Sequence, residues 1–263
     1  MFRWCAYCQH LIGEVAPLDD YSITHGLCSS CEPDAERYRP TPAGLRAQAA
    51  MTGLLSAGRA GRYDSAVASL EEASAAGATP IDLMIGLLQP ALFEIGRLWK
   101  TGKITTTDEH RFTSFCERAM SALPAPPEPP LTAPLVLLVL VDGNAHDLGV
   151  RMLSRVAAGD GARCEALYPG SPNDDILSLC RRERPALLGV SASLPEHLPP
   201  ADVLARRVTA ELGIKTVLGG GALRRGPVAP LTTPTIETLD AFRALVAGLK
   251  RSTRPPPQTP VFL

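Results

Sequence analysis

The chain has 263 residues, of which 45% are hydrophobic and 20% are charged, and its formal net charge is −1. This balance is typical of a soluble globular protein with one large or two smaller domains, and it does not indicate a nucleic-acid-binding surface. The longest apolar runs are too short to cross a bilayer, and the first residues lack an apolar segment of signal-peptide length. We therefore expect a cytoplasmic protein with no membrane contact.

Four of the seven cysteines lie in the first 31 residues and form two C-x2-C pairs, Cys5 with Cys8 and Cys28 with Cys31. Structural zinc takes four ligands in a tetrahedron, and its binding contributes folding energy that so short a segment cannot obtain from a core. We therefore expect residues 1–34 to form a small zinc-ribbon-like module with four cysteine ligands. Two disulfides or free thiols are the alternatives, and the lack of a signal peptide disfavours the disulfides.

The remaining candidate metal ligands are histidines and cysteines outside these pairs. His10 and His25 could each replace a cysteine ligand, but we expect them to lie beside the ligands or on the surface. Cys116, Cys164 and Cys180 lie in apolar surroundings and are predicted to be core residues. The stretch THGLCSSC resembles the short cysteine knuckles of some bacterial sensory proteins, a resemblance that implies no particular function.

Residues 41–123 are predicted to form a helical bundle. One helix has Thr79 as a candidate N-cap and Pro80 at its first position, and Pro90 is expected to kink it. Its apolar residues recur on one face at helical spacing as far as Trp99. This pattern predicts that the helix buries that face in the bundle.

A proline-rich linker, PAPPEPPLTAP at 124–134, separates the bundle from a segment with a different pattern. Between 135 and 252, short apolar runs alternate with amphipathic helical segments, which predicts a doubly wound parallel β-sheet and an α/β fold class. The first run, PLVLLVLV, is typical of a strand buried on both faces. Residues 253–263 are expected to be a disordered tail.

Ligands of doubly wound sheets bind beyond the carboxyl ends of the strands. Here the first strand leads to His146, the third ends at Ser191–Leu194, and the fourth ends at Gly219–Ala222. These ends offer a metal-binding imidazole, small hydroxyl groups and a bare backbone. They suit a large flat ligand with a metal centre and a buried tail.

The stretch NAHDLG resembles the D-x-H-x-x-G motif of cobalamin-binding domains, with Asn144, His146 and Gly149 at the motif positions. A serine element and a glycine element follow in that family at matching distances, and here they fall on Ser191 and Ser193 and on Gly219, Gly220 and Gly221. The resemblance implies that the sheet domain binds cobalamin and that His146 replaces the cofactor's own base as the lower cobalt ligand. The displaced nucleotide tail would then lie beside the serines and glycines.

The sequence departs from this family pattern at two positions. Asn144 stands where the family has aspartate, and Ser193 stands where it has leucine or threonine. An amide oxygen still accepts a hydrogen bond from the imidazole Nδ1–H, but it makes the ring less basic and the cobalt bond weaker. The alternative for His146 is a loop histidine that faces solvent.

The stretch WKTGKITTTDEH resembles the W-x9-EH motif of cobalamin-dependent photoreceptors of the CarH type, on Trp99, Glu109 and His110. The resemblance extends from about Leu45 to Ser252. It implies that Trp99 lies against the upper axial group of the cofactor, that Glu109 hydrogen-bonds the adenosyl moiety, and that His110 lines the same pocket or a neighbouring surface. The alternative is a core tryptophan followed by a helix whose first turn is stabilised by Glu109.

By this resemblance the chain is a light sensor, not an enzyme, and it has no catalytic residues. Its cofactor is expected to be adenosylcobalamin, and light-driven cleavage of the cobalt–carbon bond would make the helical cap repack. A histidine follows the tryptophan in some family members, but here Lys100 does. Some relatives also bind a bilin beside the cobalamin, and the sequence is neutral on that point.

Output is expected to run through a protein partner or self-association, without direct nucleic-acid contact. Two other functions stay open. One is a corrinoid carrier for methyl transfer, which shares the helical cap and the sheet domain. The other is a zinc-ribbon adaptor with a vestigial cobalamin fold, an alternative that Asn144 keeps open.

Overall fold

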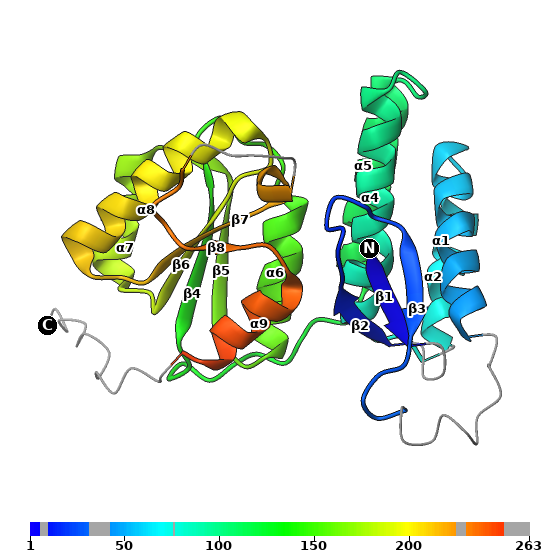
Figure 1. Cartoon of the computed structure of the whole chain (residues 1–263), viewed down its shortest axis with the longest axis horizontal. Coiled ribbons are helices and arrows are strands. Elements are labelled where there is room, and N and C mark those ends of the chain that lie inside the picture. Colours follow the sequence, from blue (N-terminus) through cyan, green and yellow to red (C-terminus); the bar gives the residue numbers. More distant parts are fainter. Residues whose placement is uncertain (6–9, 32–42, 76, 225–229, 250–263) are drawn as a thin grey trace, which may run out of the picture. The chain divides into compact units, whose positions relative to one another are not determined.

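The computed structural model describes residues 1–5, 10–31, 43–75, 77–224 and 230–249 (Figure 1). The chain divides into two units, one of Met1–Ala125 with Thr238–Asp240, and one of Pro126–Glu237 with the chain from Ala241 onward. The expected tail at 253–263 lies outside the described residues. In the part of the chain that the structure describes, no helix is long and apolar enough to cross a membrane.

A three-stranded sheet begins the first unit. Its strands are β1 (Phe2–Cys5), β2 (Leu11–Glu14) and β3 (Ile23–Gly26). The order is β2-β1-β3, with β1 antiparallel to β2 and parallel to β3. Alternate residues of a strand point to the same face, and both Phe2 and Trp4 are only 1% exposed. The cysteine segment is therefore a folded sheet with a buried apolar face.

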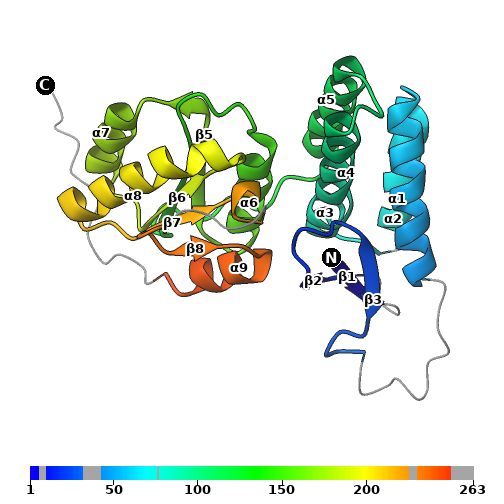
Figure 2. The same cartoon turned by 45° about the horizontal axis from the view of Figure 1, so that its top comes forward.

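The predicted helical bundle follows this sheet in the first unit (Figure 2). It consists of α1 (Ala43–Arg59), α2 (Tyr63–Ala75), α3 (Pro80–Leu83), the π-helical turn η2 (Met84–Leu88), α4 (Gln89–Lys100) and α5 (Thr106–Ala122). Thr79 is the N-cap of α3, as predicted, and its hydroxyl accepts a hydrogen bond from the Asp82 backbone N–H.

A π-helical turn stands where the sequence predicts a kink. The Gln89 N–H donates to the Met84 carbonyl, five residues back, directly before Pro90. Proline has no N–H to donate, which removes an α-helical hydrogen bond at this point. After the turn, Ala91, Ile95 and Leu98 are buried at helical spacing.

Trp99 lies outside that buried stripe. Successive residues of an α-helix are about 100° apart, so Trp99 lies on a different face from its neighbour Leu98. Leu98 is 7% exposed and Trp99 is 48% exposed. The predicted apolar stripe therefore ends on Leu98, and Trp99 is not a core residue.

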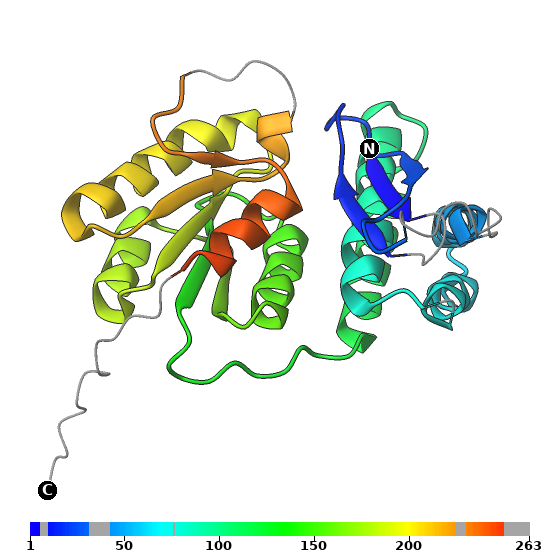
Figure 3. The ribbon, with the colours of Figure 1, turned by 60° about the horizontal axis from the view of Figure 1, so that its bottom comes forward.

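The second unit confirms the predicted α/β fold, with a parallel five-stranded sheet in the order β5-β4-β6-β7-β8. Its strands are β4 (Leu135–Val141), β5 (Arg163–Ser171), β6 (Leu187–Ser191), β7 (Thr216–Gly219) and β8 (Thr235–Ile236). Its helices are α6 (Leu148–Gly159), α7 (Asn173–Glu183), α8 (Leu198–Leu212) and α9 (Leu239–Ala247). Helices α7 and α8 cover one face of the sheet, and α6 and α9 cover the other (Figure 3).

The chain first moves from β4 to β5 and then returns past β4 to β6. The order of the strands therefore reverses between β4 and β6. In doubly wound sheets a crevice forms at the carboxyl ends of the two strands that flank such a reversal. The topology therefore predicts a ligand site among the residues that follow Val141 and Ser191.

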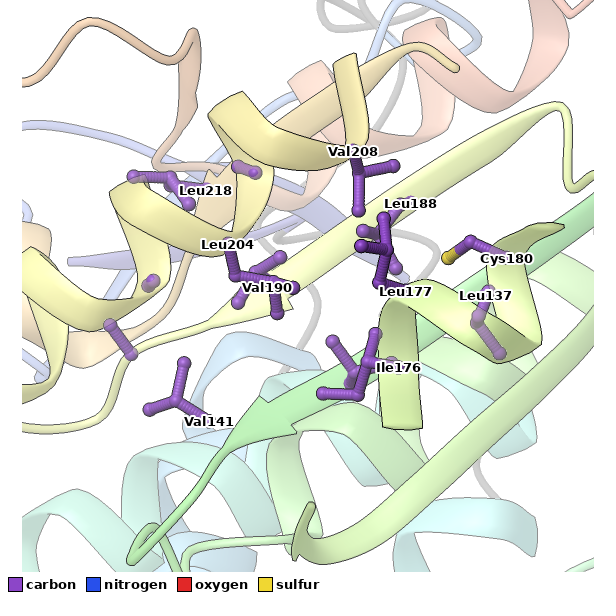
Figure 4. Close-up of a cluster of buried hydrophobic side chains, with 14 of the residues drawn as sticks. Leu137, Val141, Ile176, Leu177, Cys180, Leu188, Val190, Leu204, Val208 and Leu218 are labelled. Atoms are coloured by element: carbon purple, nitrogen blue, oxygen red, sulfur yellow. The ribbon is translucent and has the colours of Figure 1, made fainter. Parts of the chain in front are cut away.

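A continuous apolar core fills the space between the sheet and the helices α7 and α8 (Figure 4). The core includes Leu137, Leu188 and Val190 from the strands and Leu204 and Val208 from α8, and all five are at most 1% exposed. Such burial is the main favourable contribution to folding. The core fixes the strands and hence the loops that extend from their carboxyl ends.

We predict that Leu204→Ala lowers the free energy of unfolding by about 2–5 kcal/mol, because it leaves a cavity between α8 and the sheet. Urea denaturation followed by circular dichroism measures this loss. The matched control is Val203→Ala on the same helix, whose side chain is 42% exposed. Equal losses for the two variants would contradict the assignment of this core.

Candidate functional site

The loop between β4 and α6 carries the predicted histidine motif. Asn144 is 1% exposed, whereas His146 is exposed at the carboxyl edge of the sheet. Asn144 Oδ1 accepts a hydrogen bond from the His146 backbone N–H at 3.1 Å and lies 3.3 Å from His146 Nδ1. The amide oxygen can only accept, so this contact assigns a proton to Nδ1, and in the neutral form of the ring the lone pair is then on Nε2. Neutral imidazole of this kind is a metal ligand.

The other end of the Asn144 side chain reaches a different strand. Asn144 Nδ2 donates to the Ser191 carbonyl oxygen at 3.1 Å. A carboxylate has no hydrogen to donate to that oxygen, so asparagine makes a contact here that an ionised aspartate cannot make. The departure from the family motif is therefore compatible with an oriented histidine, as the sequence suggested.

The serine and glycine elements are joined by backbone hydrogen bonds. The Ala192 N–H donates to the Gly219 carbonyl at 2.8 Å, and the Ala222 N–H donates to the Ala192 carbonyl at 3.1 Å. Gly220 has φ +111°, and a Cβ there would lie 2.3 Å from the Ala192 oxygen. Only glycine is compatible with this close approach.

The structure thus brings all the predicted residues of the sheet domain to one edge. Asn144 connects the His146 loop to Ser191, and Ala192 connects the serine element to the glycines. Ser191 and Ser193 are half-buried, as are Gly219 and Gly221, while Gly220 is exposed. Gly149 lies in the first turn of α6, and a Cβ at Gly149 would contact nothing within 4 Å. This edge combines an exposed imidazole with open space and glycine backbone.

Sequence reasoning did not single out His197, the last residue of the 3-10 turn η3 (Pro195–His197) that follows the serine element. Its ring centroid lies 6.5 Å from that of His146, with 57° between the ring planes. The His197 Nδ1 accepts the Leu194 N–H at 3.3 Å. The sequence signal was its position four residues after Ser193, but only the fold places the two histidines together.

In the helical domain, the Trp99 indole N–H donates to Thr106 Oγ1, at the start of α5, over 3.1 Å. Thr106 and Glu109 share a face of α5, because residues three apart are neighbours on a helix. The structure therefore places Trp99 and Glu109 on the same side of the domain. His110 is next to Glu109, with its Nε2 3.5 Å from Glu109 Oε2 and its side chain 72% exposed.

A different acid stabilises the start of α5. Asp108 forms a capping box with Thr105, and hydrogen bonds from Thr105 hold the pKa of the Asp108 carboxyl below its usual value. Glu109 instead accepts a hydrogen bond from Thr113 Oγ1 at 2.9 Å. The capping role that the sequence left open for this region thus belongs to Asp108.

Three of the four predicted zinc ligands converge in the N-terminal sheet. The sulfur atoms of Cys5, Cys28 and Cys31 all lie within 4.8 Å of one another, and Cys8 lies outside the described residues. His10 Nδ1 is 2.9 Å from the Asp82 carboxylate, and His25 is exposed on β3. Among the described residues, the cluster of possible metal ligands therefore contains neither histidine.

The remaining predicted core cysteines are protonated thiols. Cys116 and Cys180 are fully buried, and Cys164 is half-buried. Burial raises the pKa of Cys164 to about 12 and that of Cys180 to about 11, and it raises the pKa of Cys116 well above its usual range. Thiols with such pKa values are poor nucleophiles and poor metal ligands at neutral pH.

A buried carboxylate joins the cysteine sheet to the helices of the first unit. Asp82 is 6% exposed, and its oxygens accept from the Leu11 N–H at 3.0 Å and from both the N–H and the hydroxyl of Thr79 at 2.8 Å. The same carboxylate contacts His10, whose carbonyl accepts from Cys5 N–H. Sequence reasoning missed this role, since the T-P-x-D spacing signals only a helix start.

Aromatic packing reinforces the same junction. Tyr21 stacks on Phe93 of α4 with ring centroids 3.9 Å apart. A Cβ on Gly86, within the π turn, would lie 2.2 Å from Trp4 Cζ2, so the indole rests directly against the helix backbone. The cysteine sheet is therefore packed on the helix that carries Trp99.

Comparison with known families identifies two segments of the chain. Residues 51–123 match one family described as a B12 binding domain, and residues 134–229 match a second family with the same description. Together they span more than half of the chain. No curated protein shows a significant similarity to it.

Several solved structures are similar. The monomethylamine corrinoid protein of Methanosarcina barkeri is 18% identical over 74% of this chain and 95% of its own, with a TM-score of 0.59. The methanol:cobalamin methyltransferase complex MtaBC of the same organism is 20% identical over 85% and 94%, with a TM-score of 0.38. A cobalamin-binding protein of Desulfitobacterium hafniense is 16% identical over 74% and 95%, with a TM-score of 0.36. At these identities the first likeness supports the fold alone.

We predict that Asp82→Asn lowers the free energy of unfolding of the helical domain by about 2–3 kcal/mol, because the amide turns an NH2 group toward donors that a carboxylate accepts. Thermal and urea denaturation of the full chain measure the effect. Glu71→Gln, an exposed position on α2, is the matched control. A loss below about 0.5 kcal/mol for Asp82→Asn would show that the junction contributes little.

Proposed function

Because the chain is a cobalamin-binding protein by both of its B12 binding domains, we propose that it is a light sensor that uses adenosylcobalamin. The sheet domain would supply the lower contacts of the cofactor through His146, and the helical domain the upper contacts through Trp99 and Glu109. Adenosylcobalamin supplies a cobalt–carbon bond that visible light breaks. The protein's part is to bind the cofactor, orient it and respond when its upper group leaves.

The observation that carries the proposal is the exposure of Trp99. A large aromatic side chain on a helix normally adds to the core, yet Trp99 is 48% exposed and its indole is oriented by Thr106. Glu109 lies on the same face of the domain, and Asp108 has the capping role. The side chains of Trp99 and Glu109 are both partly exposed, so neither is buried in the core of the bundle. Both are therefore available to a ligand.

The geometry at the sheet edge fits the lower face of the cofactor. The Asn144 contact assigns the lone pair of His146 to Nε2, the nitrogen that would bind cobalt. Gly149 has open space above it, and the glycine element cannot carry side chains at Gly220. Ser191, Ser193 and these glycines would hold the displaced nucleotide tail.

Loss of the upper group would remove the contacts of Trp99 and Glu109 and leave an apolar surface to be covered again. The π turn η2 leads directly into α4, and such turns are often found at functional sites, so α4 is the element expected to shift. The signal would then pass to a partner protein or to a second copy of the chain. The proposal includes neither a bilin nor direct nucleic-acid contact.

A corrinoid carrier for methyl transfer is the second candidate. It is favoured by the fold shared with the monomethylamine corrinoid protein, 95% of which this chain covers. A carrier does not need a motif that contacts an adenosyl group. The two candidates therefore differ in the light response and in the choice of upper group.

We also propose that the N-terminal sheet holds one zinc ion on Cys5, Cys28 and Cys31, with Cys8 as the fourth ligand. The convergence of three sulfur atoms supports this proposal. Four thiolates complete a tetrahedral site, which is typical of structural zinc. The ion would stabilise the sheet and would not take part in the light response directly.

The light-sensor proposal predicts that green light changes both the absorption spectrum and the elution volume of the protein loaded with adenosylcobalamin. Size-exclusion chromatography and absorption spectroscopy, before and after illumination, measure the two changes. The protein loaded with hydroxocobalamin, which has no upper alkyl group, is the control. Photolysis without any change in size or shape would instead favour the carrier.

Two variants on α5 test whether Glu109 contacts the adenosyl group. Glu109→Gln should weaken adenosylcobalamin binding about tenfold and leave methylcobalamin binding unchanged, since only the former has an adenosyl group. Glu117→Gln, on the same helix, should change neither affinity. If both cofactors lose affinity equally, Glu109 does not contact the adenosyl group.

The zinc proposal predicts about one zinc ion per chain and a specific pattern of alkylation. At pH 8, iodoacetamide should modify the four N-terminal cysteines only after chelation, because bound thiolates are protected. Cys164 and Cys180 should stay unmodified in the folded protein, since burial raises their pKa values to about 12 and about 11. Mass spectrometry of the peptides reads out each site. Full modification without chelator would reject the metal site.

A further inference from the structure

His197 is the one described side chain at the sheet edge with an imidazole close to His146 that neither motif includes. It follows the serine element directly, on the turn η3 (Pro195–His197), and it is half-buried. The centroids of the two rings are 6.5 Å apart. A ligand bound through His146 would therefore lie within reach of His197.

The two imidazoles present different atoms to such a ligand. His146 Nδ1 faces the Asn144 oxygen and carries the proton, which assigns the lone pair to Nε2. His197 Nδ1 accepts the Leu194 N–H at 3.3 Å, so in its neutral form His197 carries the proton on Nε2. One ring offers a metal ligand, and the other offers a hydrogen-bond donor.

The position of His197 indicates which part of the ligand its Nε2–H would contact. His197 is on the same loop as Ser191 and Ser193, at the end of β6, where the proposed function places the displaced nucleotide tail. That tail contains a phosphodiester, whose anionic oxygens accept strong hydrogen bonds. The corrin ring itself presents mainly amide side chains, which do not carry a charge.

We propose that His197 is a specificity-determining residue of the cofactor site, which donates a hydrogen bond from Nε2 to the phosphodiester of the cobalamin nucleotide tail. The inference rests on the proposed cobalamin site at His146. It adds a residue that selects corrinoids with a complete tail over those without one. His197 holds the tail while His146 holds the metal, so the two residues act on different parts of one ligand.

The test compares hydroxocobalamin with cobinamide, which has the same corrin ring but lacks the nucleotide tail. Absorption titrations of the full chain give both affinities. His197→Ala should weaken hydroxocobalamin binding about tenfold and leave cobinamide binding unchanged. His197→Gln should restore much of the loss, because the amide can both accept from Leu194 and donate to the ligand. Glu196→Gln, an exposed neighbour, is the matched control.

Each outcome bears on the inference. If His197→Ala lowers the affinity for hydroxocobalamin and for cobinamide equally, the residue only shapes the loop. If neither affinity changes, the residue does not contact the ligand. Either result overturns the inference. The melting temperatures of the cofactor-free variants distinguish a folding defect from a loss of ligand binding. If the alanine variant does not fold, His197→Gln provides the comparison instead. Failure of the light-sensor proposal is distinct, since a carrier would still bind both corrinoids, whereas failure of the cobalamin site itself would leave a wild-type chain that binds neither corrinoid.

Discussion

The buried side chain of Asn144 ties the end of β4 to the end of β6, and the geometry of the candidate site depends on this tie. Its amide N–H donates to the Ser191 carbonyl oxygen at the end of β6, and its amide oxygen accepts from the His146 backbone N–H in the loop after β4. The two ends of the amide are not interchangeable here, because a flipped amide would point oxygen at oxygen and hydrogen at hydrogen. A side chain that is fixed at both ends also fixes the proton on His146. The strand reversal thus places the candidate site, and Asn144 orients the His146 imidazole within it.

Much of the sheet domain could be predicted because its strands, glycine element and histidine motif are each specified by residues close together in the sequence. The apolar run at β4 is typical of a strand covered on both faces, and the glycine element has a positive φ that excludes other residues. The histidine motif is local as well, since Asn144 and His146 are two residues apart. What the sequence could not provide are contacts between distant segments. Asp82 meets Leu11 across 71 positions, and no spacing rule predicts such a pair.

The helical domain shows the other limit of sequence reasoning. Apolar periodicity includes Trp99 in the buried stripe of α4, but that stripe ends one residue earlier. Periodicity locates a helix face only to within about one residue, or about 100° of rotation. At Trp99 that difference separates a packing residue from a residue that a ligand can contact. The fold alone does not decide between a sensor and a carrier, because related folds support different functions. The proposed roles of Trp99 and Glu109 are what would distinguish a sensor from a carrier.

The junction at Asp82 has a consequence for how the chain can be divided. The cysteine sheet and the helices share one buried carboxylate, a stacked aromatic pair and a tryptophan pressed against the π turn. Segments that complete each other's hydrogen bonds tend to unfold together as one cooperative unit. The sheet is therefore not an appended tag that can be deleted or exchanged without effect on the helices. A version of the protein that begins at α1 would expose the helix surface that Trp4 and Tyr21 cover, and Asp82 would lose its contacts with His10 and Leu11. The cooperative folding unit thus begins ahead of the family-matched segments.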